Sequence, residues 1–137
     1  MPLDPVRLAD TRGWMQKAEM DMRSAQVDLT AVPPLVGDAL FHCQQAVEKT
    51  LKAFLTWHDR PFRKTHDLVE LGVQCSDIDA ELEALLREAA PLTEYAWKFR
   101  YPGDASEPRA SEAEVAIDIA FRVIAAVRDR IRADTSS

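Results

Sequence analysis

Apolar residues recur at three- and four-residue steps through residues 36–58 of this chain. The recurring positions are Leu40, Cys43, Val47, Leu51 and Phe54. Steps of this size place side chains on one face of an α-helix, whereas a half-buried strand requires strict alternation. The segment therefore predicts a long amphipathic helix with one face in a core.

Similar stripes predict helices on either side of this segment. An N-terminal helix is expected from Val6 or Asp10 to Thr30, with Asp10 or Thr11 as its cap. Pro33 and the proline after it should stop that helix, because consecutive prolines remove N–H donors and exclude α conformation. The remaining expected helices run from Thr65 or His66 to Gly72, from Ser76 or Asp77 through Leu86, from Pro91 to about Arg100, and from Ser111 to about Arg132.

These segments predict an all-α protein. Gly is scarce, with four residues in 137, and β-sandwiches or barrels need more turn glycines and more β-branched runs. We expect an antiparallel up-and-down bundle of about four to five main helices plus a short extra helix. We expect residues 1–137 to form a single domain, with loose ends at about 1–5 and 134–137.

The last expected helix is apolar over more than half of its circumference. Its apolar positions are Val115, Ala116, Ile117, Ile119, Ala120, Phe121, Val123, Ile124, Val127 and Ile131. A bundle helix needs only about 100° of apolar arc to cover one core. Two explanations stay open: burial among several neighbouring helices, or burial at a subunit interface.

The net charge of −6 excludes a global basic field that would draw the chain onto nucleic acid. The charges are uneven, however, because five bases but only one acid lie between Lys49 and Lys64. This contrast indicates either a local anion site or two solvated faces. No apolar run approaches the about 20 residues of a membrane span, and the first residues lack the apolar stretch of a secretory signal. We therefore expect a cytoplasmic protein with no membrane partner.

The sequence lacks the motifs of several site classes. The three histidines and the two cysteines, Cys43 and Cys75, have no zinc-type spacing and no disulfide framework. Glycine-rich phosphate-binding loops and a Gly-x-Ser-x-Gly elbow are missing as well. We expect no metal and no cofactor.

Three segments, in this order and spacing, resemble the HEPN family. They are Phe41-His42-Cys43-Gln44-Gln45-Ala46-Val47-Glu48-Lys49-Thr50-Leu51-Lys52-Ala53, then Thr65-His66-Asp67-Leu68, then Arg100-Tyr101-Pro102. Trp14, Ala18, Asp21 and Ala25 are similar to the family's first helix. The resemblance implies a bundle of four or five helices that pairs as a homodimer. It also implies a minimal nucleotidyltransferase as partner, within a toxin–antitoxin type system.

Other HEPN members are metal-independent ribonucleases with an Arg-x(4–6)-His motif near the fourth helix. This chain departs from that pattern, since no histidine follows Arg100. Arg60 and His66 have the spacing but lie in the expected loop after the second helix, so we interpret their match as coincidence.

Six residues are candidates for binding a nucleotide or RNA: His42, Gln45, Lys49, Lys52, Arg100 and Tyr101. Helical spacing allows the first four to share a face, where imidazole and amide groups meet a base or ribose and the lysines meet phosphate. Arginine and tyrosine also suit nucleotide faces. The alternative is that His42 is satisfied by a neighbouring helix, Arg100 pairs with an acid and Tyr101 packs a helix end.

Catalysis is the runner-up hypothesis. His66 is the candidate base for a 2′-hydroxyl, and Arg63 or Arg100 the candidate partner for the developing phosphorane charge. The alternative to catalysis is that His66 caps the short helix and forms only local hydrogen bonds. The preferred interpretation is a nucleotide- or partner-binding module without chemistry. A metal-independent ribonuclease and a purely structural interaction protein remain as alternatives.

Overall fold

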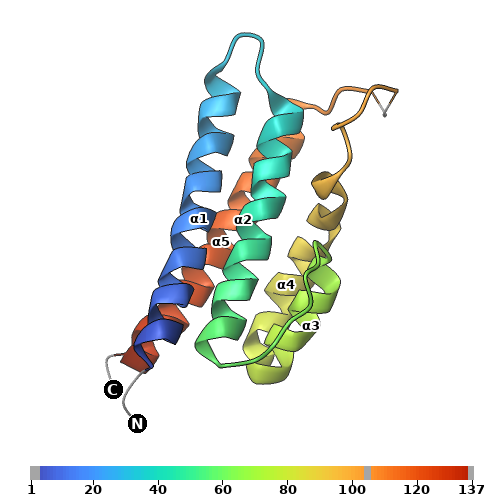
Figure 1. The fold of residues 1–137 in the computed structure, drawn as a ribbon. Helices are drawn as coiled ribbons and strands as arrows, with labels where there is room; N and C mark the ends of the chain where they lie inside the picture. Colours follow the sequence, from blue (N-terminus) through green and yellow to red (C-terminus); the bar gives the residue numbers. More distant parts are fainter. Residues whose placement is uncertain (1–3, 104–105, 136–137) are drawn as a thin grey trace.

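The computed structural model describes residues 4–103 and 106–135. Its elements are α1 (Pro5–Thr30), α2 (Val36–Trp57), α3 (Leu68–Ile78), η1 (Ala80–Leu82), α4 (Glu83–Ala89), η2 (Ala90–Ala96) and α5 (Ala110–Thr135). Figure 1 shows α1, α2 and α5 as three long helices, with α3 and α4 beside α2. The described ranges contain helices and no strand, so the predicted all-α bundle is confirmed.

The core forms around α2, which packs against α1, α3, α5 and η2. All five positions of the predicted α2 stripe are buried, from Leu40 to Phe54. Small buried residues of the neighbouring helices, such as Ala18 on α1 and Ala120 on α5, meet this stripe in one contiguous cluster. Burial of this stripe therefore determines which residues lie on the remaining, polar face of α2.

The start of α1 agrees with the predicted Val6 to within one residue, but its cap differs from the prediction. Asp4 caps the helix, because its Oδ1 accepts a hydrogen bond of 2.9 Å from the amide of Val6. Pro5 stands in the first turn, where its missing N–H is harmless. The predicted caps Asp10 and Thr11 were wrong, and Thr11 is instead buried inside the helix.

The prediction that Gly72 ends the short third helix was also wrong. α3 starts at Leu68 with Asp67 as its cap and continues through Gly72 to Ile78. A Cβ on Gly72 would make an ordinary van der Waals contact of 3.6 Å with the Cβ of Leu86, so this glycine lies where α3 packs against α4. Asp79, rather than Ser76 or Asp77, caps the next turn.

The helix predicted from Pro91 to about Arg100 is shorter and tighter than expected. Pro91 lies in the first turn as predicted, but the segment is the 3₁₀ helix η2 and stops at Ala96, not near Arg100. Phe99 then takes a φ of 66°, in the left-handed region that ends regular helix. α5 begins at Ala110, so Ser111 lies within the helix and is not its cap.

Only part of the wide apolar arc of α5 is covered within one chain. Ala116, Ala120 and Val123 are buried, whereas Val115 and Phe121 remain exposed. Residues 1–3 and 136–137 of the predicted loose ends lie outside the described residues, while Pro5 and Thr135 are helical. Across the described ranges, no helix combines the length and the apolar character that a membrane crossing requires.

Candidate functional site

A first acid–histidine–lysine network connects α1 to α2. Asp21 of α1 is nearly buried, and its two carboxylate oxygens receive separate partners. His42 Nδ1 lies 2.8 Å from Oδ1, and Lys49 Nζ donates to Oδ2 at 2.6 Å. A carboxylate only accepts, so Nδ1 of His42 carries the hydrogen. Asp21 thereby ties two positions of α2, about two helical turns apart, to α1.

A second network of the same composition lies on α2 and the loop after it. Glu48 has only 5% of its side chain exposed, and His66 Nδ1 lies 2.7 Å from its Oε1. Lys52 Nζ donates to Oε2 at 3.0 Å and is itself 8% exposed. The buried carboxylate is therefore paired on both oxygens, as a charge in the interior requires.

Aromatic rings and an amide complete the surroundings of the second network. The Lys52 ammonium lies 5.5 Å from the ring centroid of Trp14 and 5.8 Å from that of Phe62. These distances fit cation–π attraction. Gln44 donates to Glu48 Oε1 at 3.2 Å and to the carbonyl of His66 at 3.1 Å. Lys52 thus faces the interior of the site.

His66 is the exposed member of this network, with 66% of its side chain accessible. Because Nδ1 donates to Glu48, a neutral imidazole presents the lone pair of Nε2 outward. No hydrogen bond joins Nε2 to any residue in the described ranges. A buried carboxylate that orients an exposed imidazole is the arrangement of a general base or of a ligand-binding donor–acceptor.

The loop that carries His66 is attached to the bundle at several points. Arg63 makes a bidentate pair with Glu70 of α3, with distances of 2.6 and 3.0 Å. Gln74 donates to the carbonyl of Pro61 at 3.0 Å. The pKa of Glu70 is lowered because Arg63 donates hydrogen bonds to its carboxylate. The arginine predicted to assist His66 is therefore engaged with α3.

Arg100 lies at the far end of α2. Its Nη1 donates to Asp38 Oδ1 at 3.2 Å, and its guanidinium carbon lies 3.9 Å from the ring centroid of Phe41. A Cβ on Gly37 would lie 3.2 Å from the Cβ of Phe99, so the glycine permits this close approach. Tyr101, the next residue, is 67% exposed.

Acidic groups gather around His42 as well. His42 Nε2 lies 3.4 Å from Asp38 Oδ2, and the carboxyl group of Asp28 on α1 lies close to both side chains. Burial, followed by the interaction with the neighbouring Asp38 carboxyl group, raises the pKa of Asp28 to about 6. The thiols of Cys43 and Cys75 have their pKa raised to about 12 by burial, so neither is a nucleophile at neutral pH.

The predicted residues fall into two groups. His42 and Arg100 converge on Asp38, whereas His66 pairs with Glu48. Gln45 joins the second group, because its amide donates to Gln44 Oε1 at 2.7 Å. The structure thus brings His42 and Arg100 together and places His66 in a separate network.

Sequence analysis did not assign a site role to Asp21 or Glu48. Asp21 follows Ala18 by three residues and precedes Ala25 by four, so an acid stands within a buried stripe. Glu48 likewise follows the buried Val47 on the most buried helix. A charge within an apolar face was the available signal, since such charges are almost always paired.

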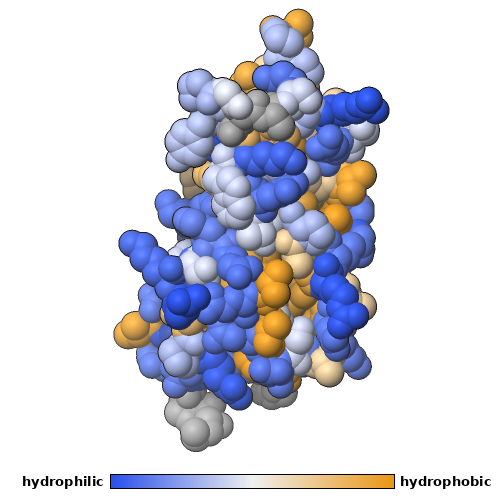
Figure 2. All heavy atoms as spheres, turned by 90° about the vertical axis from the view of Figure 1, so that its right-hand side faces the viewer, coloured by the Kyte–Doolittle hydropathy of each residue, from blue (hydrophilic) through white to orange (hydrophobic). Residues whose placement is uncertain are grey.

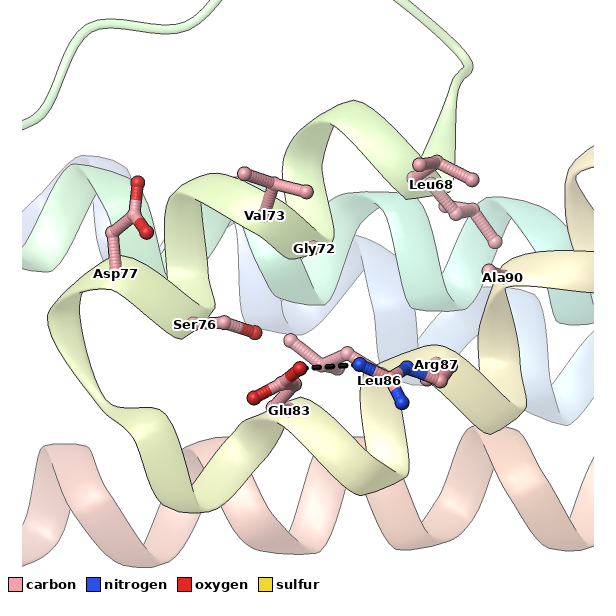
Figure 3. Close-up of a pocket in the computed structure, with 10 residues that line it drawn as sticks. Leu68, Gly72, Val73, Ser76, Asp77, Glu83, Leu86, Arg87 and Ala90 are labelled. Atoms are coloured by element: carbon pink, nitrogen blue, oxygen red, sulfur yellow. Dashed lines mark hydrogen bonds and ion pairs between the residues drawn. The ribbon is translucent and has the colours of Figure 1, made fainter.

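An apolar groove lies elsewhere, between α3 and α4. Figure 2 shows a narrow band of hydrophobic side chains on the side of the molecule where these helices lie. Figure 3 shows Leu68, Val73, Leu86 and Ala90 along the groove, with the Glu83–Arg87 ion pair at its edge. The groove holds no histidine, and both histidine networks lie outside it.

Comparison with known proteins gives one match. A protein-family model described as HEPN domain matches residues 11–130. No match was found among the curated proteins or among the solved structures. The matched range includes both histidine networks and all the predicted site residues.

Proposed function

The chain belongs to the HEPN family, and on that premise we propose that it is a nucleotide-binding module that works beside a protein partner. The observation that supports this most is the exposed imidazole of His66, which the buried carboxylate of Glu48 holds in one orientation. A fixed, accessible imidazole costs little conformational entropy when it binds a ligand.

The surroundings of His66 suit an anionic ligand. Lys64 is exposed and forms no ion pair with any residue of the described ranges. A lysine ammonium meets phosphate as a point charge, while Nε2 of His66 accepts from a ribose hydroxyl. Lys49 does not belong to these surroundings, because its ammonium pairs with Asp21 in the first network. In this proposal Lys52 has a different task, because its buried ammonium neutralises Glu48.

The partner in this proposal is a minimal nucleotidyltransferase of a toxin–antitoxin type system, and the module itself is a homodimer. Both follow from the family rather than from a contact in this chain. The exposed Val115 and Phe121 on α5 support a protein contact, because single-chain packing leaves them in solvent. The site at His66 lies on the loop after α2.

Thermal unfolding in the presence of ATP, of AMP and of a short single-stranded RNA tests the binding proposal. A ligand that binds only the folded state raises Tm. We expect a rise for the wild type that is lost in His66→Ala and Lys64→Ala. Arg87→Ala is the matched control, since it removes one exposed positive charge from α4. An unchanged Tm with all three ligands would reject the proposal.

A metal-independent ribonuclease is the second candidate function, and the Glu48–His66 pair is the observation that favours it. A carboxylate that fixes the imidazole tautomer leaves Nε2 ready to take a proton from a 2′-hydroxyl. Arg63 and Arg100 are paired with Glu70 and Asp38, whereas Lys64 forms no ion pair within the described ranges and is available to meet the developing phosphorane charge.

Incubation of the protein with total RNA in EDTA distinguishes the two functions. Cleavage by the wild type and by Arg87→Ala, but not by His66→Ala, would establish the ribonuclease. Intact RNA with all three proteins, together with a nucleotide-induced rise in Tm, is the result that the binding module predicts.

A further inference from the structure

The turn between α1 and α2 brings together three acceptor side chains that the sequence keeps apart. Asp28 lies in the last turn of α1, Asp38 lies in the first turn of α2, and His42 lies one turn further along α2. One ligand atom from each side chain lies within 4.8 Å of the other two. Asp38 and His42 are one helical turn apart on α2, and the hairpin brings Asp28 of α1 to them.

The hydrogen bond to Asp21 fixes the tautomer of His42 in this cluster. Nδ1 donates to Asp21 Oδ1 at 2.8 Å, so a neutral ring directs the lone pair of Nε2 at Asp38 Oδ2, 3.4 Å away. Two lone pairs repel each other unless a positive charge lies between them. A carboxylate that holds the far nitrogen of an imidazole is also the usual outer-shell partner of a metal-bound histidine.

Asp28 supplies a second and independent observation. Its Oδ2 is buried and has no hydrogen-bond partner within the described residues. Such an unpaired acceptor is costly, and it is a sign of a missing ion or proton. A proton between His42 and Asp38 would leave Asp28 Oδ2 unpaired, whereas a bound cation can accept electron pairs from all three residues.

The remaining charges leave room for a cation. Arg100 pairs with Asp38 through Oδ1 and leaves Oδ2 to the cluster, and Lys49 pairs with Asp21. The three carboxylates of Asp21, Asp28 and Asp38 therefore outnumber the two basic side chains. Asp38 is 42% exposed and His42 23% exposed, so the cluster is open to solvent and to water ligands.

We propose that Asp28, Asp38 and His42 bind a divalent transition-metal ion at the hairpin between α1 and α2. One imidazole nitrogen and two carboxylates form a mixed ligand set that suits Zn²⁺, Mn²⁺, Fe²⁺ or Co²⁺, and water completes the coordination. Arg100 and Lys49 remain as outer-shell partners that hold Asp38 and Asp21. The site is separate from His66, so it holds or fails independently of the proposed nucleotide binding.

Co²⁺ is the probe for this site, because its visible absorption reports the coordination geometry. We expect calorimetric titration of the full chain to give one Co²⁺ per chain, with affinity about ten-fold or more weaker in Asp28→Asn and Asp38→Asn. Both variants keep the side-chain shape, and circular dichroism checks that they fold. Glu83→Gln, an exposed acid on α4, and His66→Ala, the most exposed alternative ligand, should bind like the wild type.

Two results would overturn the proposal. One is the absence of Co²⁺ binding by the wild type up to about 1 mM, the weakest affinity worth assigning to a site. The other is binding that persists in both Asp variants or disappears in His66→Ala, which would place the ion on the surface elsewhere.

Discussion

The two acid–histidine–lysine networks have the same composition but different exposure. Asp21 pairs with His42 and Lys49 across two helices, whereas Glu48 pairs with Lys52 on its own helix and with His66 on a loop. In the first network the histidine is 23% exposed and its second nitrogen faces Asp38. In the second network the histidine is 66% exposed. The first arrangement connects helices, and the second presents an imidazole to solvent.

The largest expected effect comes from Glu48→Gln. This change keeps the shape of the side chain but leaves the 8%-exposed ammonium of Lys52 without a counter-charge. Removing one partner of a buried ion pair costs about 3–5 kcal/mol of unfolding free energy. Urea unfolding measures the loss. Glu83→Gln breaks the exposed pair with Arg87 and should cost less than about 1 kcal/mol. Equal losses of unfolding free energy in Glu48→Gln and Glu83→Gln would contradict the burial of the Glu48–Lys52 pair.

Asp21→Asn should have the next largest effect, at about 1–3 kcal/mol. Its partner Lys49 is 23% exposed and regains water when the carboxylate is lost, so the penalty is smaller than for Glu48. Urea unfolding again gives the value. A loss as large as that of Glu48→Gln would show that the link between α1 and α2 matters more than burial of the lysine.

Loss of the histidine should cost more unfolding free energy in the first network than in the second. His42→Ala removes a hydrogen bond to the nearly buried Asp21 and should cost about 1–2 kcal/mol. His66→Ala removes a partner of Glu48 but leaves the Lys52 pair intact, and we expect a cost below about 1 kcal/mol. Thermal unfolding of the two variants side by side tests the comparison. The reverse order would mean that His66 stabilises the fold rather than serving a ligand.

The smallest effect is a pH dependence at Asp28. Its pKa of about 6 exceeds the ordinary value of 3.8, so between these pH values the folded protein binds more protons than the unfolded chain. Stability from this group is therefore complete below about pH 4 and is lost as pH rises through 6. Asp28→Asn should be more stable than the wild type at pH 7, on the order of 1 kcal/mol, with the difference shrinking toward pH 4. A Tm difference that stays constant over this range would contradict the raised pKa.

The sequence predicts the helices well because burial repeats with the helical period, as the α2 stripe from Leu40 to Phe54 demonstrates. It fails at Gly72, since a glycine that ends a helix and a glycine at a helix contact look alike in sequence. The helix predicted from Pro91 to about Arg100 was wrong in type and length for a related reason. A 3₁₀ segment such as Ala90–Ala96 has no apolar period of its own.

The candidate site is less predictable, because its contacts join residues distant in sequence. His42 and Asp21 are separated by 21 positions, and Arg100 and Asp38 by 62. The Glu48–Lys52 pair is an exception, because its i, i+4 spacing places both side chains within one helical turn. The residue types were therefore visible in the sequence, but their division into two networks required the packing of α1 and the loop against α2.

The attachments of the loop that carries His66 have a consequence for binding kinetics. Gln44 holds the carbonyl of His66, Gln74 holds that of Pro61, and Arg63 is paired with α3. Most of the ordering of this loop is thus completed during folding, so an incoming ligand meets a preorganised surface and spends little of its affinity on closing a loop. Association should then proceed in one step, with a rate set by diffusion and by the local positive charge rather than by a slow rearrangement.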